Sequence, residues 1–255
     1  MAAALEFVDL AVARDAPGIR MAVPGMVPSP WSEATKGLFR LQHVPVMAVR
    51  SPRGPELAEW TKSHNVPVVF CDREPPRTSW AAILALAVRL GDPDVLLPHD
   101  VGTRAATVGM IHEIAGEDGL GWAARLAMIH ASLTSNGARG FPLPVAQYLA
   151  GKYGYVPARI DAGYARAVAI LAALGDRLGA AAYFGGETPN ALDVYAATFL
   201  TPITEITEEA CPRLSPALRA AFATAAEQLG PSVPATLFAH HRRMFDSHLA
   251  WPIEL

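Results

Sequence analysis

The sequence predicts two parts, an α/β unit near the N-terminus and an all-helical region after it. Three observations predict this division. Apolar runs typical of strands alternate with helical stretches over residues 19–92, a segment rich in Gly, Asp and Pro follows at residues 91–98, and Ala-rich helical stretches make up the remainder. Alternating strands and helices favour one layered unit, whereas a run of helices alone favours a separate helical domain.

Three strands are expected in the first part. The strand at residues 19–27 is predicted by the alternating apolar residues Ile19, Met21, Val23 and Val27, with Pro24-Gly25 as an irregularity inside it. A second short apolar strand is predicted at residues 44–49. The third, at residues 66–71, is opened by Pro67, and proline is tolerated there because the first position of a strand needs no ladder donor.

Two helices complete the predicted α/β unit. One runs from Ser29 to about Gln42, with Ser29 at the N-cap, Pro30 at the first helical position and Glu33 in the first turn. The other begins after Ser79 and covers residues 80–88. It is apolar on nearly every face, so we expect it to be buried.

The second part is predicted to contain helices only. The chain then divides into an N-terminal extension at residues 1–18, an α/β domain at 19–92 and a helical domain at 99–255. The candidate helices are residues 103–114, 121–133, 144–153, 162–178, 192–201, 217–229 and 235–249.

Composition excludes several classes of protein. Hydrophobic residues make up 51% of the chain and charged residues 18%, so there is enough apolar surface for a folded core. Lys and Arg number 21 against 24 Asp and Glu, without a concentrated basic run. A nucleic-acid partner is therefore not expected.

The cysteines and apolar segments indicate the compartment. Cys71 and Cys211 are too few and too far apart for a disulfide framework or a Cys-rich zinc site, which fits a reducing environment. The N-terminus has no basic segment before an apolar run, so no signal peptide is expected. The most apolar stretch, residues 81–90, is shorter than the roughly 20 residues of a membrane span. We expect a soluble cytoplasmic protein without membrane contact.

Three short motifs in the first part resemble the glutathione S-transferase family. Ser29-Pro30-Trp31-Ser32 is similar to the Ser/Cys-Pro-Phe-Ser turn that follows the family's first strand. Val66-Pro67-Val68 resembles the family's cis-proline element, and Thr78-Ser79-Trp80-Ala81 is similar to its Glu-Ser-x-Ala helix start. Each motif alone is weak, but their order and spacing before a helical half make the combination specific.

A fourth feature lies in the helical half. Asn190-Ala191-Leu192-Asp193 looks like the family's N-capping box, in which Asn190 accepts from a first-turn amide and Asp193 reaches back. We expect it to serve folding rather than catalysis. The resemblance covers the whole chain in architecture and implies a thioredoxin-like N-terminal domain, a helical C-terminal domain, glutathione as co-substrate and a homodimer.

The resemblance implies that Ser29 contacts the glutathione thiol, with Ser32 as the alternative. A thiol with a pKa of about 8.5 is only about 3% ionised at pH 7. A hydroxyl hydrogen bond and a helix N-terminus that lower the pKa by about two units would raise this fraction to about 75%. A thiolate of lower pKa is also a weaker nucleophile, and this offsets most of the gain from higher ionisation. Orientation of the reactants must therefore supply most of any acceleration. The plain alternative for Ser29 is a helix N-cap.

Other residues of the three motifs are expected to bind glutathione. The main chain of Val66 before a cis Pro67 would pair with the cysteinyl part, and Trp31 belongs to the Ser29 turn. Ser79 and Thr78 would hold the γ-glutamyl end, since a hydroxyl and an amide at a helix N-terminus favour a carboxylate.

Two details bear on the charged ends of glutathione. The family commonly places an acid or an amide at the position of Thr78, and a neutral hydroxyl cannot replace an acid beside the γ-glutamyl ammonium, so Glu74 or another acid would have to compensate. Lys62 and His64 could reach the glycyl carboxylate, although loop charges are commonly only solvated.

The remaining Cys, His and Trp residues give weaker indications of function. Cys71 on a buried strand is expected to be a small core residue. His112-Glu113 begins like a zinc-protease motif, but Gly116 stands where the second histidine would be. His240, His241 and His248 are expected at the surface of the last helix, and Trp80, Trp122 and Trp251 in the core. No metal site is predicted.

The leading hypothesis is therefore a glutathione S-transferase-like enzyme whose thiolate attacks an apolar electrophile, or which cleaves or isomerises one with glutathione. The principal alternative is a binding or interaction module that kept the fold and lost catalysis. A thiol-disulfide oxidoreductase is disfavoured because the Ser29 turn has no cysteine.

Overall fold

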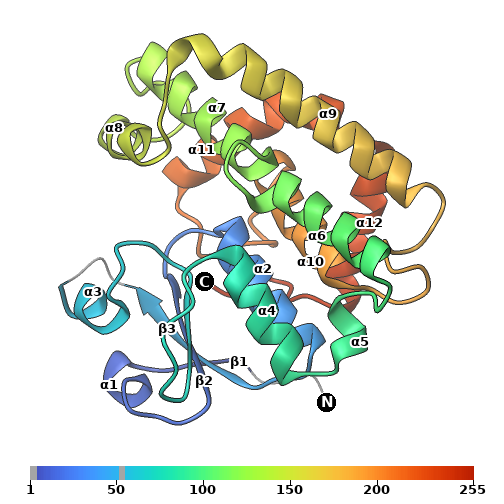
Figure 1. Cartoon of the computed structure of the whole chain (residues 1–255). Coiled ribbons are helices and arrows are strands. Elements are labelled where there is room, and N and C mark those ends of the chain that lie inside the picture. Colours follow the sequence, from blue (N-terminus) through green and yellow to red (C-terminus); the bar gives the residue numbers. More distant parts are fainter. Residues whose placement is uncertain (1–4, 52–54) are drawn as a thin grey trace.

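The computed structural model describes residues 5–51 and 55–255. Residues 1–4 of the predicted N-terminal extension lie outside the described residues. The chain forms a sheet with helices on both faces, and a helical bundle packs against one side of this layered unit (Figure 1). The predicted fold class, an α/β part followed by an all-helical part, is confirmed.

The sheet has four strands in the order β1-β3-β2-β4. They are β1 (Leu5–Phe7), β2 (Ile19–Pro24), β3 (Val46–Ser51) and β4 (Val68–Cys71). β3 is parallel to both β1 and β2, whereas β4 is antiparallel to β2. The three expected strands are present with shifted ends. β1 was not predicted, because three residues are too few to show a period of two.

Each face of the sheet carries its own apolar cluster. Alternate residues of β2, such as Met21 and Ala22, point to opposite faces and join different clusters. One face packs on α2 (Pro30–Leu41) and α4 (Trp80–Leu90), and the other on α1 (Leu10–Ala13) and α3 (Pro55–Thr61) (Figure 1).

The expected full burial of the helix after Ser79 is wrong. In α4, Ile83, Leu84, Leu86 and Ala87 are buried, whereas Ala81 and Ala85 are exposed. Alanine has little apolar surface to hide, so an Ala-rich helix can look apolar all round in sequence and still face water on one side.

The helical region begins earlier than its first long helix. A four-residue helix, α5 (Pro93–Leu96), occupies the segment that the sequence indicated only as punctuation. The longer helices lie within two residues of their predicted ends. They are α6 (Val101–Ala115), α7 (Leu120–Thr134), α8 (Leu143–Lys152), α9 (Ile160–Leu178), α10 (Ala191–Leu200), α11 (Pro216–Leu229) and α12 (Ala235–Ser247).

α10 is the centre of the molecule. All its residues are buried, and it packs against α2 of the first part and against α6 and α12 of the second. Its start is the predicted capping box: Asn190 Oδ1 accepts from the Leu192 amide at 2.8 Å, and Asp193 Oδ2 accepts from the Asn190 amide at 2.8 Å. This prediction is confirmed.

Two predictions about side-chain exposure are wrong. His240 and His241 were expected at the surface, but both are buried, because α12 turns them toward α10. His240 Nε2 lies 2.7 Å from Asp193 Oδ1, which is the carboxylate partner that the sequence did not indicate. Trp251 was expected in the core and is 44% exposed, and its ring forms an edge-to-face pair with Phe245, with 5.0 Å between ring centres.

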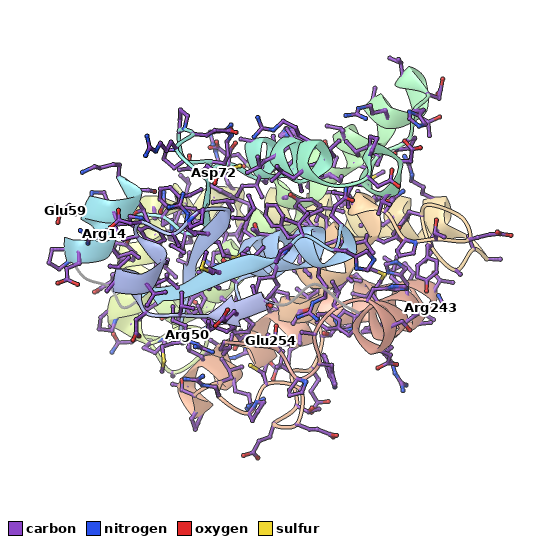
Figure 2. All side chains as sticks on the ribbon, turned by 90° about the horizontal axis from the view of Figure 1, so that it is seen from below. Arg14, Arg50, Glu59, Asp72, Arg243 and Glu254 are labelled. Carbon is purple, nitrogen blue, oxygen red and sulfur yellow. The ribbon has the colours of Figure 1, made fainter. Side chains whose placement is uncertain are left out.

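Residues 251–255 return to the sheet part. The Arg40 guanidinium lies 2.9 Å from the Glu254 carboxylate, and the Lys36 ammonium donates to the Glu254 carbonyl at 2.6 Å. Arg50 donates to the Leu255 carbonyl at 2.6 Å. Figure 2 shows Arg50 and Glu254 on the same side of the sheet part, and Asp72 on the opposite side. The C-terminal segment therefore stabilises the C-terminal half of α2 through Lys36 and Arg40.

Among the described residues, no helix is both long enough and apolar enough to cross a membrane.

Candidate functional site

The register of the sheet places two of the sequence motifs together. β2 and β4 are antiparallel, with Ala22 opposite Val68. The Val66-Pro67 segment just before β4 therefore lies beside the end of β2, from which the chain runs on to Ser29. The Val66-Pro67 peptide bond is cis, as the resemblance implied.

The position of the third motif, Thr78-Ser79, is fixed by an isolated β-bridge. Val69 and Arg77 exchange main-chain hydrogen bonds of 2.9 and 2.8 Å in an antiparallel pair. Thr78-Ser79 consequently lies beside the start of β4, next to Val66-Pro67. The chain that leaves β2 toward Ser29, the Val66-Pro67 segment and Thr78-Ser79 thus lie at the same end of β2 and β4, and we call this region the motif edge.

Ser29 begins α2 without capping it through its side chain. Its main chain is ordered by the helix, since the Glu33 amide donates to the Ser29 carbonyl at 2.9 Å. Its hydroxyl makes no capping bond, and no hydrogen bond of this hydroxyl is formed within residues 5–51 and 55–255. Pro30 has no backbone N–H, so the Trp31 N–H is the first amide donor of the helix. Ser29, which is 9% exposed, therefore keeps a hydroxyl free beside a helix N-terminus.

Ser32 is in a different position. It is fully buried, and its hydroxyl has no hydrogen-bond partner in the described structure. A ligand at the motif edge could touch it only if neighbouring side chains moved. Of the two candidate serines, Ser29 is the one with accessible surface.

Trp31 faces the helical region rather than a free space. Its indole N–H donates to the Ala115 carbonyl at 2.9 Å, and its ring meets Phe199 edge to face at 4.9 Å. Gly121 on α7 permits this approach, because a Cβ there would overlap the Phe199 ring and lie 3.1 Å from Trp31. Trp31 thus joins the two parts of the molecule.

The main chain of Val66 is unpaired. Within the described residues, neither its amide nor its carbonyl takes part in a backbone hydrogen bond, although Pro67 after it is buried. Lys62 and His64 precede it in an exposed loop. An extended ligand could pair with Val66 at this position.

At the other end of the motif edge, Thr78 and Ser79 are both exposed. Ser79 caps α4, since its hydroxyl accepts from the Ala82 amide at 3.2 Å. Its amide, its hydroxyl proton and its second lone pair are left for a ligand. The hydroxyl of Thr78 supplies no charge.

Glu74 does not fill the role that the sequence left open for it. Its carboxylate lies 2.6 Å from the Arg89 guanidinium and 2.7 Å from that of Arg77. The hydrogen bond from Arg89 and the charges of both arginines hold the pKa of Glu74 below its usual range. A ligand ammonium would have to compete with two guanidinium groups for this carboxylate.

The sequence did not indicate how α6 contacts the motif edge. Ala115 of α6 accepts from Trp31, and one turn earlier the exposed His112 imidazole stacks on the Trp80 ring, with 5.9 Å between ring centres and 15° between planes. Trp80 directly follows Ser79. One face of α6 therefore reaches both ends of the motif edge, through residues that lie far from the motifs in the sequence.

Neither cysteine is activated. Cys71 and Cys211 are buried, and burial raises the pKa of both thiols. Within the described parts of the chain, no group of three or more His, Cys, Asp or Glu side chains could hold a metal ion.

The sequence and the structure were compared with those of known proteins, and only the structure comparison finds matches. No protein-family model matches the sequence, and no curated protein matches it significantly. Solved structures do. A glutathione S-transferase from Xanthobacter autotrophicus superimposes with a TM-score of 0.57 at 14% identity, over 93% of this chain and 98% of that one.

Two further structures agree. A glutathione S-transferase from Methylobacillus flagellatus with glutathione bound gives a TM-score of 0.58 at 13% identity, over 89% of this chain and 95% of that one. Human glutathione S-transferase T1-1 gives 0.55 at 18% identity, over 93% of each chain. The resemblance inferred from the motifs is thus confirmed in three dimensions, and the chain has the glutathione S-transferase fold.

Proposed function

We propose that the protein is a glutathione S-transferase-like enzyme that binds glutathione along the motif edge. The observation that supports this proposal is that two groups of the motif edge have no hydrogen-bond partner among the described residues: the Ser29 hydroxyl at the start of a 12-residue helix, and the main chain of Val66. A cysteinyl ligand that pairs with Val66 would bring its sulfur toward the start of α2. Solved structures of the same fold hold glutathione, which supports this choice of ligand.

The Ser29 end of the edge suits a thiolate. The hydroxyl can donate to the sulfur, and the amides of the first turn of α2 favour a negative charge. The thiol gives up its proton to solvent, its sulfur forms a bond to an electrophilic carbon, and the leaving group departs with the electron pair. Glutathione-dependent cleavage or isomerisation would begin with the same attack.

A second candidate, a binding module without catalysis, is supported by the opposite end of the edge. Thr78 is neutral, and Glu74 is already paired with Arg77 and Arg89. The γ-glutamyl ammonium then has no free carboxylate among these residues, and weak glutathione binding would leave little turnover.

One experiment separates the two candidates. Glutathione binding is measured by calorimetry, and turnover is measured with an activated aryl halide, in the native chain and in the variants Ser29→Ala and Ser32→Ala. The enzyme proposal expects binding in all three proteins and turnover at least tenfold lower in Ser29→Ala alone. Glutathione binding without turnover in the native chain supports the module. Absence of binding at millimolar glutathione contradicts the enzyme proposal and supports the module.

We further propose a homodimer in the cytoplasm, as the resemblance implies. Light scattering after size exclusion tests the dimer, since a 27.1 kDa chain would then give about twice that mass.

A further inference from the structure

A nearly buried arginine lies on α7, close to the motif edge. Arg125 is only 8% exposed, and within residues 5–51 and 55–255 its guanidinium forms neither a hydrogen bond nor an ion pair. Its nitrogens are not among the unpartnered side-chain atoms that are sealed from solvent, so the small exposed part of the side chain includes them. A small molecule can therefore reach its charge.

Arg125 differs in this respect from the other buried cations. Among the arginines and lysines of the described ranges, only Arg20, Lys36 and Arg125 are buried. Arg20 donates to the Asp72 carbonyl, and the Lys36 ammonium lies 2.7 Å from the Glu33 carboxylate. A cation that serves the fold thus has its partner inside the protein, and Arg125 has none there.

Two aromatic rings position the Arg125 guanidinium. Its Cζ lies 5.4 Å from the centre of the Phe141 ring and 5.9 Å from that of the Tyr153 ring. Arginine keeps its charge when it is buried, and contact with ring faces offsets only part of the cost of burying a charge without an opposite charge. The guanidinium is therefore incompletely satisfied until an anion binds to it.

Ring contacts connect this guanidinium to the start of α2. Arg125 follows Gly121 by about one turn on the same face of α7, and a Cβ on Gly121 would lie 3.1 Å from the Trp31 ring. The Tyr153 and Trp31 rings are 6.4 Å apart between centres. Trp31 is two positions after Ser29. Arg125 therefore lies on the helical side of the region in which we place the glutathione thiol.

The side chains around this region are aromatic. Trp31, Trp122 and Tyr153 are half-buried, and the Trp122 and Tyr153 rings meet edge to face at 4.7 Å. Half-buried rings keep apolar area that a flat apolar molecule can cover. Aromatic surface next to an unpaired guanidinium matches a ligand with an aromatic body and one carboxylate, the planar anion that arginine binds with two parallel hydrogen bonds.

Glutathione is not expected to supply this anion. In the proposed pose it runs from Ser29 past Val66 to Ser79, and all three residues belong to the sheet part, whereas Arg125 belongs to the helical region. The anion is therefore assigned to the second substrate.

We propose that the second substrate is an aromatic electrophile with a carboxylate, and that Arg125 binds this carboxylate. The inference rests on the proposed transferase function. The glutathione sulfur forms a bond to the electrophilic ring carbon, and the bond from that carbon to its leaving group breaks. The leaving group departs with the electron pair, and the thiol proton goes to solvent. Arg125 makes and breaks no bond; it binds the carboxylate and so orients the ring.

Two aryl chlorides of nearly equal shape test the charge preference. The first, para-chloro-meta-nitrobenzoate, carries the carboxylate, and para-chloro-meta-nitrobenzamide has a neutral amide instead. Their intrinsic reactivities differ, but this difference is common to all variants. The benzoate-to-benzamide ratio of kcat/KM should fall at least tenfold in Arg125→Met, through a higher KM for the benzoate, while both parameters for the benzamide stay within twofold.

Two further variants control for charge and position. Arg125→Lys keeps the charge without the planar fork and should retain part of the preference. Arg139→Met removes an exposed arginine that lies beyond the end of α7 and pairs with Glu227, and it should keep the native ratio.

Binding and stability are measured without turnover. Calorimetry with meta-nitrobenzoate and meta-nitrobenzamide, which have no leaving group, should show at least fivefold tighter binding of the benzoate to the native chain and no difference in Arg125→Met. The urea midpoint of Arg125→Met should be unchanged or higher, because an unpaired buried charge is removed. Glutathione affinity should be the same in the two proteins.

The outcomes separate this inference from the function on which it rests. Turnover of both chlorides with the same ratio in the native chain and in Arg125→Met supports the transferase and overturns the carboxylate site. Absence of turnover, with a benzoate preference in binding that Arg125→Met removes, contradicts the transferase and keeps Arg125 as the carboxylate site of a binding module.

Two other results would also overturn the carboxylate site. Glutathione affinity at least tenfold lower in Arg125→Met would mean that the anion belongs to glutathione itself. Equal binding of the nitrobenzoate and the nitrobenzamide to the native chain, together with a lower urea midpoint in Arg125→Met, would assign Arg125 to the fold alone.

Discussion

Two helix starts of this molecule have similar sequence patterns and opposite uses. α2 begins Ser29-Pro30 with an acid in its first turn, and α10 begins Asn190 with Asp193 three residues on. At α10 the cap is reciprocal and buried. At α2 the serine side chain makes no capping bond, and the first-turn acid Glu33 turns away to pair with Lys36 at 2.7 Å.

The difference shows how stability and binding are divided in this fold. Polar groups at the start of α10 form hydrogen bonds within the protein and stabilise its central helix. At the start of α2 the Ser29 hydroxyl is left without a partner among the described residues, although the side chain is only 9% exposed. A nearly buried N-cap side chain without a hydrogen-bond partner is therefore a better sign of a binding site than a capping motif alone.

The largest expected effect comes from breaking the α10 start. Asp193 accepts from the amides of Phe184 and Asn190 at 2.8 Å each and lies 2.7 Å from His240, all away from solvent. Asp193→Ala leaves these groups unsatisfied, so we expect a loss of about 3–5 kcal/mol in the free energy of unfolding in urea.

The control for this variant is Asp100→Ala, which removes an exposed cap at the start of α6. Its expected cost is about 1 kcal/mol. Equal losses in the two variants would contradict the central role given to α10.

A second prediction concerns pH at the other end of α10. Burial lowers the pKa of His241 to about 4, from a usual value of 6.5, and its Nε2 lies 3.2 Å from the Thr201 hydroxyl. The unfolded chain then binds this proton more readily than the folded one. Stability should fall as pH drops from 6.5 to 4, by up to about 3 kcal/mol from this group.

The share of His241 is isolated by comparing unfolding of the native chain and His241→Phe across this range. Glu33 acts in the opposite sense, because burial raises its pKa, but its contribution is common to both proteins. Parallel stability curves for the two proteins would show that His241 is not the cause.

A third prediction tests the contact that seats the α2 start. Gly121→Ala places a methyl group against Phe199 and close to Trp31, so we expect about 1–3 kcal/mol of destabilisation. Gly109→Ala, where the same methyl meets open space, should be neutral or slightly stabilising. Thermal unfolding of both variants measures the difference, and similar melting temperatures would contradict close packing at this junction.

The smallest expected effect on stability is that of Ser29→Ala. Because no capping bond is lost, the free energy of unfolding should change by less than about 0.5 kcal/mol. A loss of 1 kcal/mol or more in urea would mean that Ser29 is an ordinary cap, and the contrast with α10 would fail.

Much of this architecture could be predicted from sequence, because it depends on local patterns. The strands at Ile19 and Val68 follow apolar runs, and the α10 start follows a capping motif. The paired state of Glu74, the burial of His240 and the seat of Trp31 could not be predicted. Each depends on a partner far along the chain: Arg89, Asp193 and Ala115, respectively.

The most direct test of the account is the pKa of the glutathione thiol when it is bound. Thiolate absorbance in the ultraviolet can be titrated against pH for the complex and for free glutathione. Because the Ser29 hydroxyl is free to donate at the start of α2, we expect the pKa of the bound thiol to lie at least one unit below the free value of about 8.5. In Ser29→Ala the pKa should return toward that value. A bound thiol that titrates like the free one, in the native chain, would contradict the assignment of the α2 start to glutathione.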